Sequence, residues 1–218
     1  MSNYKLIIFD MDGTILDTLA DLANAINHTL KHFGYPTRSQ REVRSFLGNG
    51  SRYLVEHALP ADKAVVAELV DQILAYYSAY YKEHCAIYTK PYAGILELLA
   101  KLREQKRLIA VVSNKPDFGV QALCQCHFPG LFHFACGERV GIRRKPAPDS
   151  VKEVLRTLQI QPNEAVYIGD SEVDIATAKN AGLDAVIVTW GFRDKDQLIE
   201  AGAPRLAASV KELEDILL

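Results

Sequence analysis

Four short apolar runs, none of which alternates with polar residues, constrain the fold of this chain more than any other feature of its sequence. They are Leu6–Phe9, Leu108–Val112, Ala165–Ile168 and Ala185–Val188. A strand that is apolar at every position is typical of a parallel sheet covered on both faces. A fifth run, Leu131–Ala135, predicts a further strand.

Segments of helical period separate these runs. Residues Ile95–Arg103, Ser150–Leu158 and Val173–Ala181 each place apolar side chains three and four positions apart, and a helix is also predicted after Ser209. Strands that alternate with helices indicate an α/β fold with a doubly wound parallel sheet, that is, a Rossmann-like core.

One long stretch interrupts this alternation. From about Thr18 to His84 the pattern is helical only, and the spacing of Thr18 and Asp21 predicts a capping box at its start. The helices expected there cover residues 19–33, 40–47, 52–58 and 61–81. We therefore expect an α/β core domain of residues 1–16 and 86–218 with an inserted all-helical cap domain of residues 17–85.

Composition excludes several classes of protein. The 218 residues are 49% hydrophobic, and 25 Lys+Arg against 27 Asp+Glu give a net charge of −2. This composition is that of a globular protein and offers no basic surface for nucleic acid or an anionic membrane. No apolar run approaches the ~20 residues of a membrane span, and the first residues do not have the pattern of a signal peptide. We expect a cytoplasmic protein, monomer or homodimer, without nucleic-acid or membrane partners.

Polar side chains follow three of the predicted strands at the point where each strand ends. Ligands of open α/β sheets bind beyond the carboxyl ends of the strands, so these side chains are expected to meet at one edge. The residues are Asp10, Asp12 and Thr14 after the first run, Ser113 and Asn114 after the second, and Asp170 and Asp174 after the third.

These residue types suit phosphoryl transfer. Several carboxylates at one edge repel one another unless a cation lies among them, and Mg²⁺ prefers such oxygen ligands together with phosphate oxygens. Asp10 can attack phosphorus as a nucleophile, and Asp12 can act as general acid and then base. Ser113 and Asn114 can donate to phosphate oxygens with help from a helix N-terminus, and Lys145 adds positive charge.

Four segments that carry these residues resemble, in order, the four motifs of the haloacid dehalogenase-like phosphohydrolases. The resemblance covers essentially the whole chain. The segments are Asp10-Met-Asp12-Gly-Thr14, Ser113-Asn114, Lys145-Pro146 and Gly169-Asp170-x-x-x-Asp174. The resemblance implies a catalytic set of Asp10, Asp12 and Lys145. It implies Mg²⁺ held by Asp10, Asp170 and the backbone carbonyl of Asp12, with Asp174 as a supporting acid and Thr14, Ser113 and Asn114 as phosphate partners.

Within this family the chain is most similar to phosphoglycolate phosphatases, through Asp17-Thr18, the cap turn Gly48-Asn49-Gly50 and Thr189-Trp-Gly-Phe192. The expected activity is a Mg²⁺-dependent phosphomonoesterase for a small phosphorylated metabolite, 2-phosphoglycolate first, acting through an aspartyl-phosphate. Gly48, Asn49, Gly50 and Arg52 are the expected cap residues for the substrate, with Arg44 nearby.

Two alternatives stay open on the sequence. Ser51-Arg52 after the glycine turn resembles the cap residues that hold the second phosphate in β-phosphoglucomutase, so a phosphosugar mutase is one alternative. A non-enzymatic phosphate-binding regulatory module is the other. Tyr76, Tyr77, Tyr80 and Tyr81 have helical spacing, and we expect them to pack within the cap.

Overall fold

A parallel sheet forms the centre of the computed structural model, which describes residues 4–60 and 66–218. Within these residues six strands pair in the order β5-β4-β1-β6-β7-β8. They are β1 (Leu6–Phe9), β4 (Leu108–Pro116), β5 (Phe134–Glu138), β6 (Ala165–Gly169), β7 (Asp184–Val188) and β8 (Leu206–Ala207). The four principal predicted strands are confirmed. The fifth is displaced toward the C-terminus, because the β5 pairing with β4 begins at Phe134 rather than at Leu131.

Helices cover both faces of the sheet, which explains why its central strands lack polar residues. Successive residues of a strand point to opposite faces, so Ile7 and Phe9 join one hydrophobic cluster whereas Leu6 and Ile8 join another. On the first face lie α5 (Ile95–Glu104), α6 (Asp117–His127) and α10 (Val210–Leu217); on the second lie α7 (Asp149–Leu158), α8 (Glu172–Ala181) and α9 (Lys195–Glu200). The doubly wound α/β architecture is confirmed.

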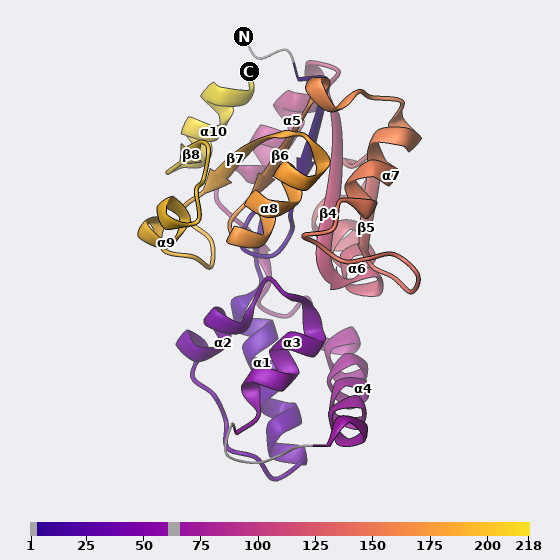
Figure 1. The fold of residues 1–218 in the computed structure, drawn as a ribbon, viewed down its shortest axis with the longest axis vertical. Coiled ribbons are helices and arrows are strands. Elements are labelled where there is room, and N and C mark those ends of the chain that lie inside the picture. Colours follow the sequence, from indigo (N-terminus) through magenta and orange to yellow (C-terminus); the bar gives the residue numbers. More distant parts are fainter. Residues whose placement is uncertain (1–3, 61–65) are drawn as a thin grey trace.

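Four helices, called the cap helices below, form the lower part of the molecule in Figure 1, at the end opposite the C-terminus. They are α1 (Leu19–His32), α2 (Gln40–Phe46), α3 (Gly50–Ala58) and α4 (Ala67–His84). The chain enters them through β2 (Leu16–Asp17) and returns through β3 (Lys90–Pro91), and these two strands pair antiparallel. Of the predicted helix over residues 61–81, residues 61–65 lie outside the described part of the chain.

The predicted capping box at the start of α1 is wrong. The Thr18 side chain makes no capping hydrogen bond. The Asp21 carboxylate instead accepts hydrogen bonds from the backbone N–H groups of Ile87, Tyr88 and Thr89 and from the Thr89 hydroxyl, at 2.8–3.1 Å. Asp21 therefore ties the first cap helix to the segment by which the chain leaves the cap helices, an interaction between residues too distant in sequence for a local pattern to predict.

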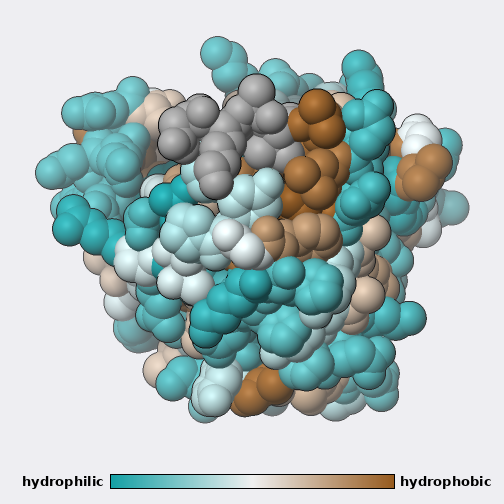
Figure 2. All heavy atoms as spheres, turned by 90° about the horizontal axis from the view of Figure 1, so that it is seen from below, coloured by the Kyte–Doolittle hydropathy of each residue, from teal (hydrophilic) through white to brown (hydrophobic). Residues whose placement is uncertain are grey.

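The end of the molecule formed by the cap helices is largely hydrophilic, with hydrophobic side chains in small groups (Figure 2). Across residues 4–60 and 66–218, none of the helices combines the length and the apolar character needed to cross a membrane.

Candidate active site

The polar residues predicted to meet at the sheet edge lie on neighbouring strands. β1 stands between β4 and β6, so Asp10 after β1 lies next to Asp170 after β6 and to Ser113 in β4. Ser113 and Asn114 belong to the last residues of β4, which continues to Pro116, and α6 begins only at Asp117. They therefore stand on the strand itself and before the start of α6, rather than after the strand as expected.

Three carboxylates form a buried acidic cluster at this edge. Asp10, Asp170 and Asp174 each present an oxygen within 4.8 Å of the others. Burial raises the pKa of Asp10 to about 6, even though the Lys145 charge opposes this shift. Burial, reinforced by the charges of Asp174 and Asp10, also raises the pKa of Asp170 well above its usual range. Buried carboxyl groups with raised pKa values fit a divalent cation, because the positive charge of the cation would favour their ionised, metal-binding forms.

Asp174 plays a supporting role in this cluster. Its Oδ2 accepts hydrogen bonds from the backbone N–H groups of Asp170 and Ser171 at 3.1 Å and from the Ser171 hydroxyl at 2.7 Å. Its Oδ1 lies 2.8 Å from the ammonium of Lys145. Both oxygens are thus occupied, and Asp174 holds Asp170 and Lys145 in place.

Lys145 connects the acidic cluster to β4. Its Nζ lies 2.9 Å from Asp10 Oδ1 and 3.0 Å from the Tyr167 hydroxyl. Burial disfavours the ammonium, but the charges of Asp10 and Asp174 outweigh it and raise the pKa of Lys145 well above its usual value. The Asn114 side chain accepts from the Lys145 backbone N–H at 2.8 Å and donates to the Lys145 carbonyl at 3.0 Å.

Asp170 is enclosed by small residues. Its Oδ2 accepts from the Phe192 backbone N–H at 2.6 Å, and the Thr14 hydroxyl donates to its Oδ1 at 3.4 Å. A Cβ atom at Gly13 or at Gly191 would lie 2.3 Å from Asp170 Oδ2. Gly13 also has φ +80, so both the close approach and the backbone conformation require glycine there.

A cavity of about 40 Å³ lies between this edge and the cap helices. The sheet side supplies polar residues and the cap helices supply mainly apolar and aromatic ones. The lining residues are Asp10, Asp12, Ser113, Asn114, Lys115 and Pro116 from the sheet side, and Leu22, Leu47, Gly48, Gly50, Ser51, Leu54, Tyr77 and Tyr81 from the cap. Gly48 and Gly50 thus reach the cavity as expected, and the Gly48 carbonyl accepts from Asn114 Nδ2 at 3.0 Å.

The predicted cap residues Asn49 and Arg52 do not line this cavity. The Arg52 guanidinium pairs with Asp71 on α4 and lies 3.6 Å from Glu56, one turn further along α3. Its side chain is 44% exposed. Arg52 points along the cap surface because two acidic partners there compensate its charge, so the expectation that it contacts the substrate is not supported.

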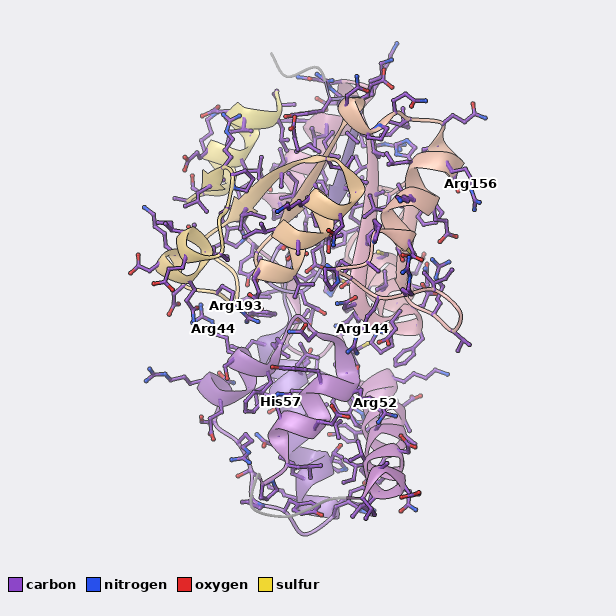
Figure 3. The ribbon with its side chains drawn as sticks, in the orientation of Figure 1. Arg44, Arg52, His57, Arg144, Arg156 and Arg193 are labelled. Carbon is purple, nitrogen blue, oxygen red and sulfur yellow. The ribbon has the colours of Figure 1, made fainter. Side chains whose placement is uncertain are left out.

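Other arginines fasten the cap helices to the rest of the molecule. Arg44 donates to the Gly191 carbonyl at 3.0 Å, and Arg193 donates to the Leu47 carbonyl at 2.8 Å. Figure 3 shows both at the junction between the cap helices and the sheet, with Arg144 at the same level on the other side and Arg52 lower, on the cap itself. Arg44 acts at the junction rather than in the cavity.

Three polar residues of the cavity wall were not predicted as site residues from the sequence: Lys115, Tyr77 and Tyr81. Lys115 is buried and its ammonium lies 2.8 and 2.9 Å from the two oxygens of Asp12. Its position directly after Ser113-Asn114 was a usable signal. Tyr77 and Tyr81 were expected to pack within the cap, and they do so, but they also face the cavity. Helical spacing identifies a common face of α4 without indicating what that face meets.

Comparison with known proteins identifies the family. The haloacid dehalogenase-like hydrolase family matches residues 7–188. The chain is a haloacid dehalogenase-like hydrolase. It is 31% identical to the phosphoglycolate phosphatase of Vibrio vulnificus over 98% of this chain and 96% of that one. A crystal structure from Lactobacillus delbrueckii subsp. bulgaricus, provisionally named a phosphoglycolate phosphatase, is 40% identical with TM-score 0.92, and the match covers 99% of this chain and 98% of that one. The phosphate complex of CbbY from Rhodobacter sphaeroides is 25% identical with TM-score 0.81 over 96% of each chain.

These relatives confirm the expected enzyme class, a phosphoric monoester hydrolase that resembles phosphoglycolate phosphatases. This haloacid dehalogenase-like hydrolase also carries an acidic cluster of the kind that a divalent metal requires.

Proposed function

We propose that this hydrolase is a Mg²⁺-dependent phosphomonoesterase for a small phosphorylated acid, 2-phosphoglycolate in the first place. The observation that carries the proposal is the position of Asp10 in the wall of a small cavity, with the Lys145 ammonium 2.9 Å away. The cavity, of about 40 Å³, is bounded on one side by the sheet edge and on the other by the cap helices. A cavity of this size suits a substrate of few atoms.

In the proposed reaction Asp10 is the nucleophile. One of its oxygens forms a bond to phosphorus while the bond from phosphorus to the leaving oxygen breaks, which gives an aspartyl-phosphate. Asp12 gives its proton to the leaving oxygen. It then removes a proton from the water that attacks the aspartyl-phosphate, which releases inorganic phosphate and restores Asp10.

The proposed metal ligands are the side chains of Asp10 and Asp170 and the backbone carbonyl of Asp12. Bound Mg²⁺ supplies positive charge that offsets the repulsion between the Asp10 carboxylate and the phosphate. Lys145 supplies further charge beside Asp10, and Asp174 holds Lys145 in position, since its Oδ1 lies 2.8 Å from the Lys145 ammonium.

Fewer residues are proposed to contact the phosphate than were expected from the sequence. Ser113 lines the cavity and remains a donor to phosphate. Asn114 uses its side chain on Lys145 and on the Gly48 carbonyl, and the Thr14 hydroxyl is directed at Asp170. We therefore assign Asn114 and Thr14 to positioning Lys145 and Asp170.

The cap helices are proposed to act as a lid. Residues 17–85 would close over a core of residues 1–16 and 86–218 to exclude water while Asp10 is attacking, and would open for hydrolysis and release. Arg44, Arg193 and Asn114 each hydrogen-bond across this junction, which supports a closed state held by a few polar contacts. A cytoplasmic location and a monomeric or homodimeric state remain predictions.

The surroundings of Arg52 disfavour the phosphosugar mutase, although Ser51 does line the cavity. A mutase must hold a second phosphate in the cap, and Arg52, the residue expected to do so, pairs with Asp71 and Glu56. The regulatory-module alternative is disfavoured because the residues of a complete reaction lie together at the sheet edge.

The test is release of inorganic phosphate from 2-phosphoglycolate, with Mg²⁺ and with chelator, by wild-type protein and by Asp10→Asn. We expect turnover in the wild type with Mg²⁺ only, and background rates in the variant. Conversion of β-glucose 1-phosphate to glucose 6-phosphate without phosphate release would instead establish the mutase.

A further inference from the structure

Two tyrosine hydroxyls in the cavity wall have no hydrogen-bond partner among the described residues. Tyr77 and Tyr81 stand one turn apart on α4, with parallel rings whose centroids are 5.7 Å apart. Each is 1% exposed, and both line the cavity. Their phenolic oxygens are buried and unpaired. Buried hydroxyls are normally paired, because leaving one unpaired opposes folding.

The neighbouring tyrosines of the same helix are different. The Tyr76 hydroxyl lies 3.1 Å from His28 Nε2, and the Tyr80 ring stacks between His28 and His84 with centroids 3.8 and 3.9 Å away. Among the described residues of α4, buried and unpaired hydroxyls are therefore confined to the two tyrosines that face the cavity. Their position indicates that a bound molecule, rather than the protein, completes their hydrogen bonds.

A buried ammonium lies in the same cavity wall, over the face of the Tyr81 ring. Lys115 Nζ is 4.9 Å from the centroid of the Tyr81 ring, and its side chain is 1% exposed. Two of its donors bond the oxygens of Asp12. An ammonium has three N–H donors, so one is not used by Asp12. The wall of the cavity thus combines one cationic donor with two hydroxyl donors.

We propose that Lys115, Tyr77 and Tyr81 bind the carboxylate of the leaving group and thereby select a phosphorylated acid as substrate. This inference rests on the proposed function. A carboxylate carries two oxygens with about four acceptor sites, enough for three donors, whereas a single hydroxyl oxygen accepts at most two.

The rest of the wall agrees with a short acid. Leu22, Leu47 and Leu54 line the same cavity and offer apolar contact to a methylene group. A second phosphate would also accept three donors, so the test includes a bisphosphorylated sugar. The tyrosine hydroxyls act here as specificity-determining groups and do not touch the phosphorus.

The test compares two substrates that differ at one group, 2-phosphoglycolate and ethyl phosphate, in which a methyl replaces the carboxylate. The measured quantity is the ratio of kcat/KM for the first substrate to that for the second. In Tyr77→Phe and in Tyr81→Phe we expect this ratio to fall by roughly tenfold, the effect of one hydrogen bond to a charged group. Tyr80→Phe, on the same helix but outside the cavity wall, is the matched control and should keep the wild-type ratio.

A second readout separates recognition from a structural role. Because neither hydroxyl has a partner within residues 4–60 and 66–218, Tyr77→Phe and Tyr81→Phe should have an unchanged or higher Tm without substrate. A lower Tm together with an unchanged ratio would mean that the hydroxyls stabilise the fold, and would overturn the inference.

Failure of the proposed substrate class and failure of this inference give different results. If the wild type shows no preference for 2-phosphoglycolate over ethyl phosphate, the proposed substrate class falls and the inference with it. If the wild type prefers 2-phosphoglycolate and both variants keep that preference, only the inference is overturned. Loss in the variants of a preference for a bisphosphorylated sugar would assign the three donors to a second phosphate instead.

Discussion

Replacing the Asp10 carboxylate by an amide should stabilise the metal-free protein at neutral pH while abolishing its activity. Asp10 is 6% exposed, and burial raises its pKa from 3.8 to about 6. The folded protein therefore binds a proton at Asp10 more tightly than the unfolded chain does. The stability contributed by this proton is fully present below about pH 4 and is lost as the pH rises through 6.

The magnitude follows from the two pKa values. The difference between 3.8 and about 6 corresponds to roughly 3 kcal/mol of unfolding free energy lost between pH 4 and pH 7. Asp10→Asn does not titrate and avoids this loss. In a chain of this length such a difference amounts to a Tm higher by up to about 6–12 °C.

The assay is thermal unfolding of wild type and Asp10→Asn in excess chelator between pH 4 and pH 7.5. The two Tm values should coincide near pH 4. Above pH 4 the Tm of the variant should exceed that of the wild type by an amount that grows with pH. Asp196→Asn, an exposed carboxylate in the first turn of α9, is the control and should show no such divergence. Equal Tm values for wild type and Asp10→Asn at pH 7.5 would refute the claim that burial dominates the Asp10 environment. Added Mg²⁺ should raise the Tm of the wild type more than that of the variant.

Three further outcomes are expected. Chelator should abolish phosphate release, and full activity in chelator would exclude the metal site. Ca²⁺, which is larger and more loosely coordinated than Mg²⁺, should inhibit the enzyme rather than replace Mg²⁺. Gly13→Ala should lower the free energy of unfolding by about 1–3 kcal/mol and raise the Mg²⁺ concentration needed for activity, because its Cβ would lie 2.3 Å from Asp170 Oδ2. Chemical denaturation measures the first effect and a Mg²⁺ titration of activity the second. Gly50→Ala should raise KM, since its Cβ would lie 3.2 Å from Glu138 Oε2 and 3.4 Å from the Asn114 carbonyl oxygen at φ +83. Arg52→Ala should leave kcat and KM nearly unchanged, because Arg52 pairs with Asp71 and does not line the cavity. Steady-state kinetics on both variants distinguish the two effects.

The sequence was sufficient wherever the signal is local. Leu6–Phe9 is apolar at every position because helices cover both faces of β1, and this pattern is visible without the fold. Asp10 and Asp170 directly follow such strands, so the topology of a parallel sheet brings them to one edge. Helical period likewise predicted the cap helices and their place after the first strand.

The short strands β2, β3 and β8 were not predicted from the sequence, because they have no local signal. Each has two residues, too few for a period, and each forms only because a distant partner is present, as when Leu16 pairs with Pro91. The role of Asp21 was missed in the same way, because its hydrogen bonds reach residues 87–89.

The sequence by itself determined which residue types stand at the ends of the strands, since Asp10 and Asp170 directly follow runs that are apolar and recognisable without the fold. Only the tertiary structure decided which cap residues face the sheet edge. Arg52 and Ser51 are neighbours in sequence, but Ser51 lines the cavity while Arg52 pairs with Asp71. Tyr77 and Tyr81 face the cavity, and Tyr80 does not. The packing angle of each cap helix fixes these directions, and that angle depends on contacts between helices far apart in the chain rather than on any local pattern.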